Sequence, residues 1–371
     1  MTVEVRTGAP RAATFRQKVR DATAGERVDV GDGALAVLVV CNLVTTVGLA
    51  GDIARHLQSP DSLNGDFLSG WHLVLYGGVT AVGVWLGIGA IQHGLRFLVT
   101  ARWTTTGFAM LAFGGVADSV WHAAFGTEAN VEALVSPPHL VVFAGLAFLL
   151  TSPIVIVWRR PTRRLGVAAS ITVLSSMTTA VLVTSLFTGF LSPLASGMTL
   201  SQGYVEPMVG ESAVDYDQVR GLGIAVWTAV VLMSALVLLL VRFRPVPLLT
   251  GLAVFLCGAP ALAISEPTLT KPLVAGYAVA GLVTELALWA LGRPTLGRAG
   301  AAIMGAVVPA SMWATNFAVL HQEGRLLWTQ SMWGGTILLS AMVGAAVGSL
   351  VALPVPLRDA PADGSVGPQA V

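Results

Sequence analysis

Apolar runs of roughly 20 residues, the length needed to cross a bilayer as a helix, recur along almost the whole of this 371-residue sequence. Only 11% of the residues are charged and 54% are hydrophobic, whereas a soluble domain carries about 25% charged residues. The net charge of +1 gives no indication of a nucleic-acid partner. The sequence therefore predicts an all-α, polytopic transmembrane helical bundle.

About ten apolar runs have the length of a transmembrane span. They lie near residues 34–54, 71–91, 103–122, 139–158, 165–190, 220–241, 246–265, 272–291, 299–320 and 332–353. Residues 1–32 are polar and basic and predict a cytoplasmic tail, and the small polar residues 355–371 predict a disordered one. We expect residues 33–160 to form repeated transmembrane hairpins and 161–354 to add six further transmembrane helices.

The basic residues gather at alternate loops. Most of the 21 Lys and Arg residues fall in the N-terminal tail or in every second loop, as in the segment WRRPTRR at 158–164. Because cytoplasmic loops of membrane proteins are enriched in Lys and Arg, both termini are predicted to be cytoplasmic. Several ionisable side chains then lie at the extracytoplasmic ends of their spans: Asp52, His56, His72, Asp118, His122 and His139.

One stretch, GGVADSVWHAAFGTEANVEALVSPPHLVVFAG at residues 114–145, places ionisable groups in an otherwise apolar region. Asp118 and His122 are four residues apart, which puts them on one face of a helix, one turn from each other. His139 begins the next apolar run, across a loop on the same side of the membrane. This hairpin can therefore bring one carboxylate and two imidazoles together.

A similar segment occurs at residues 48–78, GLAGDIARHLQSPDSLNGDFLSGWHLVLYGG. The two align, with one residue inserted in the second loop, at Gly48/Gly114, Asp52/Asp118, His56/His122, Ser69/Ser136, His72/His139, Leu73/Leu140, Val74/Val141 and Tyr76/Phe143. Internal repeats are common in membrane folds. The alignment therefore predicts a duplicated helical hairpin in the N-terminal half of the chain.

Two histidines and one carboxylate form a known ligand set for copper, zinc or iron, and they leave positions open for water, oxygen or substrate. One interfacial Asp–His pair alone is more often an anchor or a helix cap. Four of the six histidines fall at matching places in the two copies, and ionisable groups in membrane helices are usually functional. We therefore predict one metal site at Asp118, His122 and His139, and a second or vestigial one at Asp52, His56 and His72.

The second copy is predicted to hold the metal more tightly. Two prolines stiffen the approach to His139, and the same loop carries Glu128 and Glu132, which we predict as catalytic residues. In the first copy Arg55 lies beside His56, where its positive charge should oppose a divalent ion.

The segments DSVWH and SPPHLVVF of the second copy resemble the C subunit of the copper membrane monooxygenases, the particulate methane and ammonia oxidisers. That subunit carries Asp-x-x-Trp-His, a loop and Pro-x-His as copper ligands, and the matching residues here are Asp118, Trp121, His122, Pro137 and His139. The first copy matches more loosely, since Ala54 and Arg55 precede His56 where Trp is expected. The resemblance covers a minor part of the chain, and ten spans exceed those expected of that subunit. It implies copper, dioxygen, a small or lipidic substrate, and partner subunits or a homo-oligomer.

Three functions fit these residues. The leading hypothesis is a copper-dependent membrane oxidase or monooxygenase, with zinc and iron as alternative metals. The second is a metal transport or metal-delivery protein, although the inner halves of the spans lack the relay of Cys, Met or carboxylate groups that such a path needs. The third is a zinc-dependent membrane hydrolase in which Glu128 or Glu132 would be the base.

Two further groups of polar residues lie in the C-terminal half. Asn316, His321 and Glu323 resemble a degenerate third hairpin, in which Trp333 stands at the position of the returning histidine. We interpret this segment as a degenerate relative of the hairpins or an interfacial aromatic anchor. Glu285 lies inside a span, where it fits a proton or polar network and a hydrogen bond within the bundle equally well.

Overall fold

The structure is a computed structural model of the chain. It describes residues 28–58, 70–126, 135–161, 164–187, 193, 212–243, 246–265, 267–292, 297–326 and 328–351. The predicted tails at 1–32 and 355–371 lie outside the described residues, apart from 28–32.

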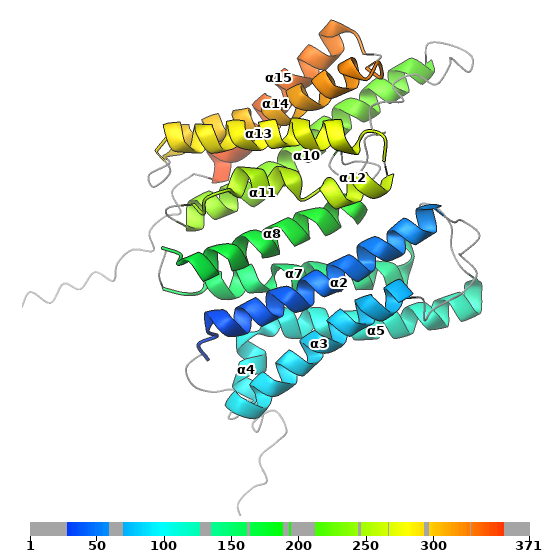
Figure 1. The fold of residues 1–371 in the computed structure, drawn as a ribbon, viewed down its shortest axis with the longest axis vertical. Helices are drawn as coiled ribbons and strands as arrows, with labels where there is room; N and C mark the ends of the chain where they lie inside the picture. Colours follow the sequence, from blue (N-terminus) through cyan, green and yellow to red (C-terminus); the bar gives the residue numbers. More distant parts are fainter. Residues whose placement is uncertain are drawn as a thin grey trace, which may run out of the picture. The chain divides into compact units, whose positions relative to one another are not determined.

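The described residues form helices joined by turns, with no strand among them (Figure 1). The helices are α2 (Asp32–Gln58), α3 (Gly70–His93), α4 (Leu95–Thr100), α5 (Arg102–Phe125), α7 (Pro137–Trp158), α8 (Val167–Phe187), α10 (Ser212–Arg242), α11 (Thr250–Leu256), α12 (Ala259–Ser265), α13 (Thr270–Ala290), α14 (Arg298–Gln322) and α15 (Gln330–Val351). A helix satisfies its backbone hydrogen bonds internally, as an apolar segment in a bilayer requires. The predicted all-α architecture is confirmed.

Nine of the described helices are long and apolar enough to cross a membrane. Their bounds agree with nine of the predicted spans to within a few residues, except that α10 begins earlier, at Ser212. The chain is therefore a multi-pass helical membrane protein.

The predicted span at 246–265 is instead divided into two short helices, α11 and α12, which are separated by a turn at Cys257 and Gly258. Pro260 explains the break, because a proline ring clashes with the carbonyl four residues earlier and supplies no N–H. That carbonyl belongs to Leu256, the last residue of α11. At the other end of α11, the Glu285 carboxylate of α13 accepts a hydrogen bond from the backbone N–H of Gly251 at 2.6 Å.

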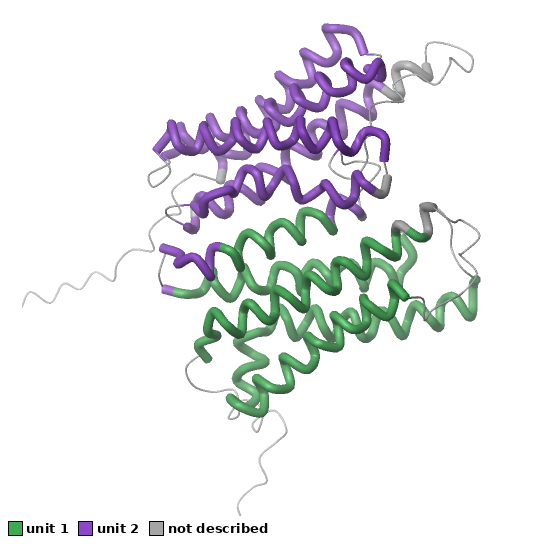
Figure 2. Tube along the Cα trace, in the orientation of Figure 1, with its two compact units in different colours: residues 1–160, 171–183 green, residues 161–170, 184–371 purple. Residues whose placement is uncertain are grey.

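The chain divides into two compact units (Figure 2). Unit 1 contains residues 1–160 and 171–183, and unit 2 contains residues 161–170 and 184–371. Most of α8 therefore belongs with the N-terminal helices, and Ser176 of α8 donates a hydrogen bond to the Leu150 carbonyl of α7. The duplicated motifs both lie in unit 1.

Unit 1 is built from two helical hairpins, α2–α3 and α5–α7, which also contact each other through α2 with α7 and α3 with α5. The Asn42 side chain of α2 donates a hydrogen bond to the Leu149 carbonyl of α7 at 3.1 Å. Near the start of α2, Arg160 contacts the Asp32 carboxylate at 2.6 Å and donates to the Val30 carbonyl at 2.7 Å. These bonds join the two hairpins in the middle and at one end.

The two hairpins share their helix packing. Gly48 of α2 lies so close to Leu75 of α3 that a Cβ atom would overlap the Leu75 backbone. In the second hairpin, a Cβ atom on Gly114 would lie 2.8 Å from the Val142 side chain and 3.2 Å from its backbone nitrogen. Leu75 and Val142 stand three residues after the aligned histidines, so both glycines make equivalent contacts.

A second glycine contact repeats in the same register. A Cβ atom on Gly78 of α3 would overlap Thr45 of α2, and a Cβ atom on Gly145 of α7 would lie 3.0 Å from Leu111 of α5. Small residues of this kind let membrane helices approach closely and gain dispersion contacts. The duplication predicted from the sequence is therefore also a duplication of helix packing.

Unit 2 is centred on α14 and α15, whose backbones approach closely where Gly305 faces Gly344. The helices α10 and α13 pack against this pair, and α11 and α12 pack against α13. Gly251 of α11 and Gly281 of α13 mark another close approach. Unit 2 thus uses the same small-residue packing with different polar side chains.

Candidate metal centre

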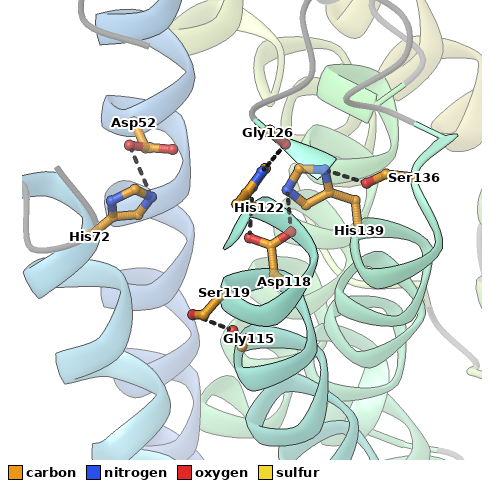
Figure 3. Close-up of polar contacts among 9 residues, drawn as sticks. All are labelled: Asp52, His72, Gly115, Asp118, Ser119, His122, Gly126, Ser136 and His139. Carbon is orange, nitrogen blue, oxygen red and sulfur yellow. Dashed lines mark hydrogen bonds and ion pairs between the residues drawn. The ribbon is translucent and has the colours of Figure 1, made fainter. Parts of the chain in front are cut away.

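The ends of α5 and α7 bring three predicted metal ligands together (Figure 3). Asp118 and His122 lie one turn apart near the end of α5, and His139 is the third residue of α7. The Nε2 atom of His122 lies 3.4 Å from Oδ2 of Asp118, and Nε2 of His139 lies 3.3 Å from Oδ1. Each imidazole therefore faces a different oxygen of one carboxylate.

These three side chains form a compact donor cluster, with one ligand atom from each within 4.8 Å of the others. Within the part of the chain that the structure describes, this is the one group of three or more His, Cys, Asp or Glu side chains with such spacing. The two histidines are each 26% exposed and the aspartate is 17% exposed. The cluster is thus partly shielded from solvent but still accessible to a small ion.

The turn after α5 fixes the orientation of His122. Its Nδ1 atom lies 3.2 Å from the carbonyl oxygen of Gly126. Because a carbonyl only accepts, Nδ1 must carry the proton, and the Nε2 lone pair of a neutral ring then points toward Asp118. Gly126 has φ 85° and ψ 178°, a conformation that is essentially restricted to glycine.

Ser136 contacts the Nδ1 atom of His139, as the Gly126 carbonyl contacts Nδ1 of His122. Ser136 occupies the N-cap position of α7 but makes no side-chain capping hydrogen bond there. Its Oγ atom instead lies 3.0 Å from Nδ1 of His139. A hydroxyl accepts as well as donates, so Nδ1 of His139 can carry its proton as His122 does and leave Nε2 available.

With both rings protonated at Nδ1 alone, the atoms that face one another at the centre of the cluster are all acceptors. A neutral imidazole that is protonated at Nδ1 presents a lone pair to the Asp118 carboxylate, and the two repel. The Oδ1 atom of Asp118 is buried and accepts no hydrogen bond from the described residues. A cation between the three side chains, either a second ring proton or a metal ion, removes this repulsion.

The first hairpin forms a related but smaller cluster. Nε2 of His72 lies 3.4 Å from Oδ1 of Asp52, and the His72 ring stacks on Tyr76 with centroids 5.7 Å apart. The side chain of the third predicted ligand, His56, lies outside the described residues. The structure therefore brings Asp52 and His72 together and leaves the third ligand a prediction.

The two predicted catalytic residues, Glu128 and Glu132, lie in the segment 127–134 between α5 and α7, outside the described residues. Their catalytic role stays a prediction.

The third motif does not form a comparable cluster. Asn316 is buried on α14, where its side-chain nitrogen donates a hydrogen bond to the Tyr277 hydroxyl at 2.8 Å. His321 is exposed in the last turn of the same helix. Asn316 thus belongs to the packing of α13 against α14, and no metal-like group containing His321 occurs among the described residues.

Sequence reasoning did not assign roles to Gly126 and Ser136. A glycine directly after a helix signals an unusual backbone conformation, and Ser136 aligned with Ser69 three residues before the returning histidine. Both signals were present, but the contact of each residue with an imidazole depends on the three-dimensional turn.

A cavity of about 570 Å³ lies elsewhere in unit 1, among α2, α3 and α4. Its lining is mainly apolar, including Cys41, Trp85 and Phe97, with Asp29 and His93 also present. None of the three clustered ligands lines it. The cavity and the cluster are therefore separate features of the unit.

No family model, no curated protein and no solved structure matches this chain. The interpretation of the cluster therefore depends on its own residues and geometry. On that basis the chain is a multi-pass helical membrane protein that carries a candidate metal-binding triad of Asp118, His122 and His139.

Proposed function

We propose that this chain is a membrane metalloprotein that binds a transition-metal ion through Asp118, His122 and His139. The observation that supports it best is the convergence of the three donors, in which the Nε2 atoms of His122 and His139 lie 3.4 and 3.3 Å from different oxygens of the Asp118 carboxylate. These separations exceed the usual 2.7–3.2 Å of a hydrogen bond to nitrogen. Two ligands held about 2.1 Å from one tetrahedral ion lie about 3.4 Å apart, so the spacing fits a shared cation.

The groups around the triad also fit this role. Histidines that bind metals usually donate the other ring N–H to a carbonyl, carboxylate or water, which fixes the ring and its tautomer. The Gly126 carbonyl and the Ser136 hydroxyl occupy these positions beside His122 and His139. Three protein donors leave coordination positions open, as in catalytic rather than structural sites.

We further propose copper as the metal and an oxidase- or monooxygenase-like reaction, with zinc and iron as alternatives. This rests on the resemblance of Asp118, Trp121, His122 and His139 to the ligand motif of the copper membrane monooxygenases. Copper would supply the redox chemistry needed to use dioxygen on a small or lipidic substrate. The chain's own residues would hold the ion and keep both imidazoles neutral and oriented, while Glu128 and Glu132 are proposed to move protons nearby.

Metal analysis of the purified protein tests the metal proposal. Copper, zinc and iron should be measured together in wild type, His122→Ala, His139→Ala and the control His93→Ala. Loss of one of three ligands should lower bound metal by about tenfold or more, while His93→Ala should match wild type. Equal metal content in all four proteins would contradict the metal site, and zinc alone would favour the hydrolase over the oxidase.

We also propose that the triad faces the extracytoplasmic side and that both termini are cytoplasmic. The distribution of Lys and Arg supports this orientation. Reporter fusions after residues 60, 130 and 205 should report the extracytoplasmic side, and fusions after residues 98 and 161 the cytoplasm. A cytoplasmic signal at residue 130 would contradict it.

A further inference from the structure

The cavity of about 570 Å³ among α2, α3 and α4 has an aromatic wall that is fixed by contacts between its side chains. The indole of Trp85 donates a hydrogen bond to the Ala34 carbonyl of α2 at 2.9 Å. The ring of Phe97 packs against this indole, with centroids 4.9 Å apart. A Cβ atom on Gly89 would overlap the Phe97 ring, so the glycine makes room for the phenyl group. Packed side chains therefore hold the cavity in shape.

The two ends of the cavity differ in polarity. Asp29, just before α2, and Gln92, near the end of α3, line the outer end beside α4 (Figure 1), and both residues are exposed. Cys41 of α2 and Ala81 of α3 line the inner end. The α3 helix rises about 16 Å between Ala81 and Gln92, at 1.5 Å per residue. The cavity is therefore long and polar at one end, a shape that suits one extended chain with a polar head.

One side of the cavity is formed by exposed apolar side chains. Val37 of α2 is 53% exposed, and Val84 and Ile88 of α3 are 56% and 51% exposed. All three line the cavity and lie in helices that are long and apolar enough to cross a membrane. In a bilayer such side chains face hydrocarbon. An amphiphile dissolved in the membrane can therefore enter the cavity from the side.

The polar end favours an uncharged head group that both donates and accepts hydrogen bonds. Among the described residues that line the cavity, none is Lys or Arg. An anionic head group would therefore meet the carboxylate of Asp29, which repels it. A hydroxyl can instead donate to the Asp29 carboxylate and accept from the Gln92 amide. Ligand pockets commonly combine a mainly apolar lining with a few polar groups that fix the orientation of the ligand.

We propose that this cavity binds a long-chain alcohol, with the alkyl chain between α2 and α3 and the hydroxyl at Asp29 and Gln92. None of the three clustered metal ligands lines the cavity. The site is thus separate from the triad and does not depend on the proposed metal-binding function.

A photoreactive probe tests the proposal in the full-length protein, reconstituted into phosphatidylcholine vesicles. n-Dodecanol with a diazirine in its chain should cross-link to peptides of α2 and α3. Unlabelled n-dodecanol at about ten times its dissociation constant should reduce this cross-linking about tenfold. Cross-linking to α13, whose exposed Val279 and Leu286 also lie in a span, is the reference for ordinary bilayer contact and should not be reduced.

Two comparisons locate the site and its head group. Ala81→Phe fills the inner end of the cavity and should abolish the competable cross-linking. Ala90→Phe is a matched control, since Ala90 is also half-buried on α3 but does not line the cavity. In the wild type, dodecanoate has the same chain with an anionic head, and it should compete about tenfold more weakly than n-dodecanol. Thermal unfolding shows whether both variants fold, and the comparison of the two competitors needs neither variant.

The outcomes that would overturn the proposal are distinct. If cross-linking to α2 and α3 resists competition as that to α13 does, only bilayer contact occurs and the site is wrong. If competable cross-linking survives Ala81→Phe, the ligand binds outside the cavity. Equal competition by dodecanoate would overturn the assignment of the head group. All three results are independent of the metal content of the protein.

Discussion

The two hairpins of unit 1 share their backbone packing and differ in their chemistry. In both, a glycine of the first helix meets the residue three positions after the returning histidine, and a second glycine packs back in the same register. In the second hairpin three donors converge within 4.8 Å. In the first, the described donors are Asp52 and His72. Packing and ligation are therefore determined by different residues of the same repeat.

The differences concentrate around the returning helix and the turn. Gly126 follows His122 by four residues and adopts φ 85°, whereas Pro60 follows His56 by four residues, and a proline cannot adopt a positive φ. Trp71, the residue before His72, lies against Gly51, whereas Pro138 precedes His139. A duplicated helix pair can thus keep its packing while the residues that orient its ligands diverge.

The largest expected difference between the hairpins concerns their aspartates. Asp118→Ala removes the carboxylate that faces both imidazoles, so we expect the affinity of the tightest metal site to fall about a hundredfold or more. Asp52→Ala should change the same affinity by less than about tenfold, since it removes no ligand of that site. Isothermal titration with copper or zinc measures both. If Asp52→Ala abolishes binding and Asp118→Ala does not, the assignment of the tighter site is wrong.

The shared packing predicts that both hairpins are sensitive to a larger residue at the glycine of the first helix. Gly48→Val and Gly114→Val should each destabilise the protein by about 1–3 kcal/mol, because the added atoms overlap the facing helix. Gly77→Val and Gly115→Val are matched controls, since no heavy atom lies within 4 Å of a Cβ at either position. Thermal unfolding in detergent compares all four. Tolerance of valine at one site but not the other would break the equivalence of the packing.

A smaller effect is expected from the hydroxyl that orients His139. Ser136→Ala removes the partner of Nδ1 and should weaken metal binding by about tenfold. Ser119→Ala is a matched control, because its hydroxyl donates to the Gly115 carbonyl within α5 and contacts no ligand in Figure 3. Equal affinities of the two serine variants would show that Ser136 does not support the site.

Much of this architecture could be predicted from the sequence, because membrane helices depend on length and apolar composition. The spacing of Asp118 and His122 predicted their common face, and the position of His139 at the start of the next span predicted that it returns beside them. The break in the segment at 246–265 was harder to predict from the sequence. Its composition is that of a span, and the effect of Pro260 on the Leu256 carbonyl is decided by local backbone geometry.

The supporting residues of the site were harder to predict because they act through contacts between elements. The alignment of Ser69 with Ser136 showed that the serine is repeated. It did not show that the Ser136 hydroxyl contacts the imidazole of His139. Tyr76 was aligned with Phe143 as one matched position of the repeat. Its stack on the His72 ring follows only from the fold. Sequence spacing predicts which residues share a helix face, whereas the partners across helices require the fold.

The smallest expected effect concerns the turn that orients His122. Alanine fits in the space around Gly126, since no heavy atom lies within 4 Å of a Cβ there, but it strains the backbone at φ 85° by about 1–3 kcal/mol. In the Gly126→Ala variant, the turn should relax and move the carbonyl of residue 126 away from Nδ1 of His122. The carbonyl itself remains present. We therefore expect metal affinity to fall by about threefold, less than after Ser136→Ala. Pro60→Ala in the first hairpin should leave the affinity of the tightest site unchanged, because Pro60 is the residue that follows His56 by four positions and belongs to the other hairpin. If both variants weaken that site equally, the glycine turn is not what distinguishes the second hairpin from the first.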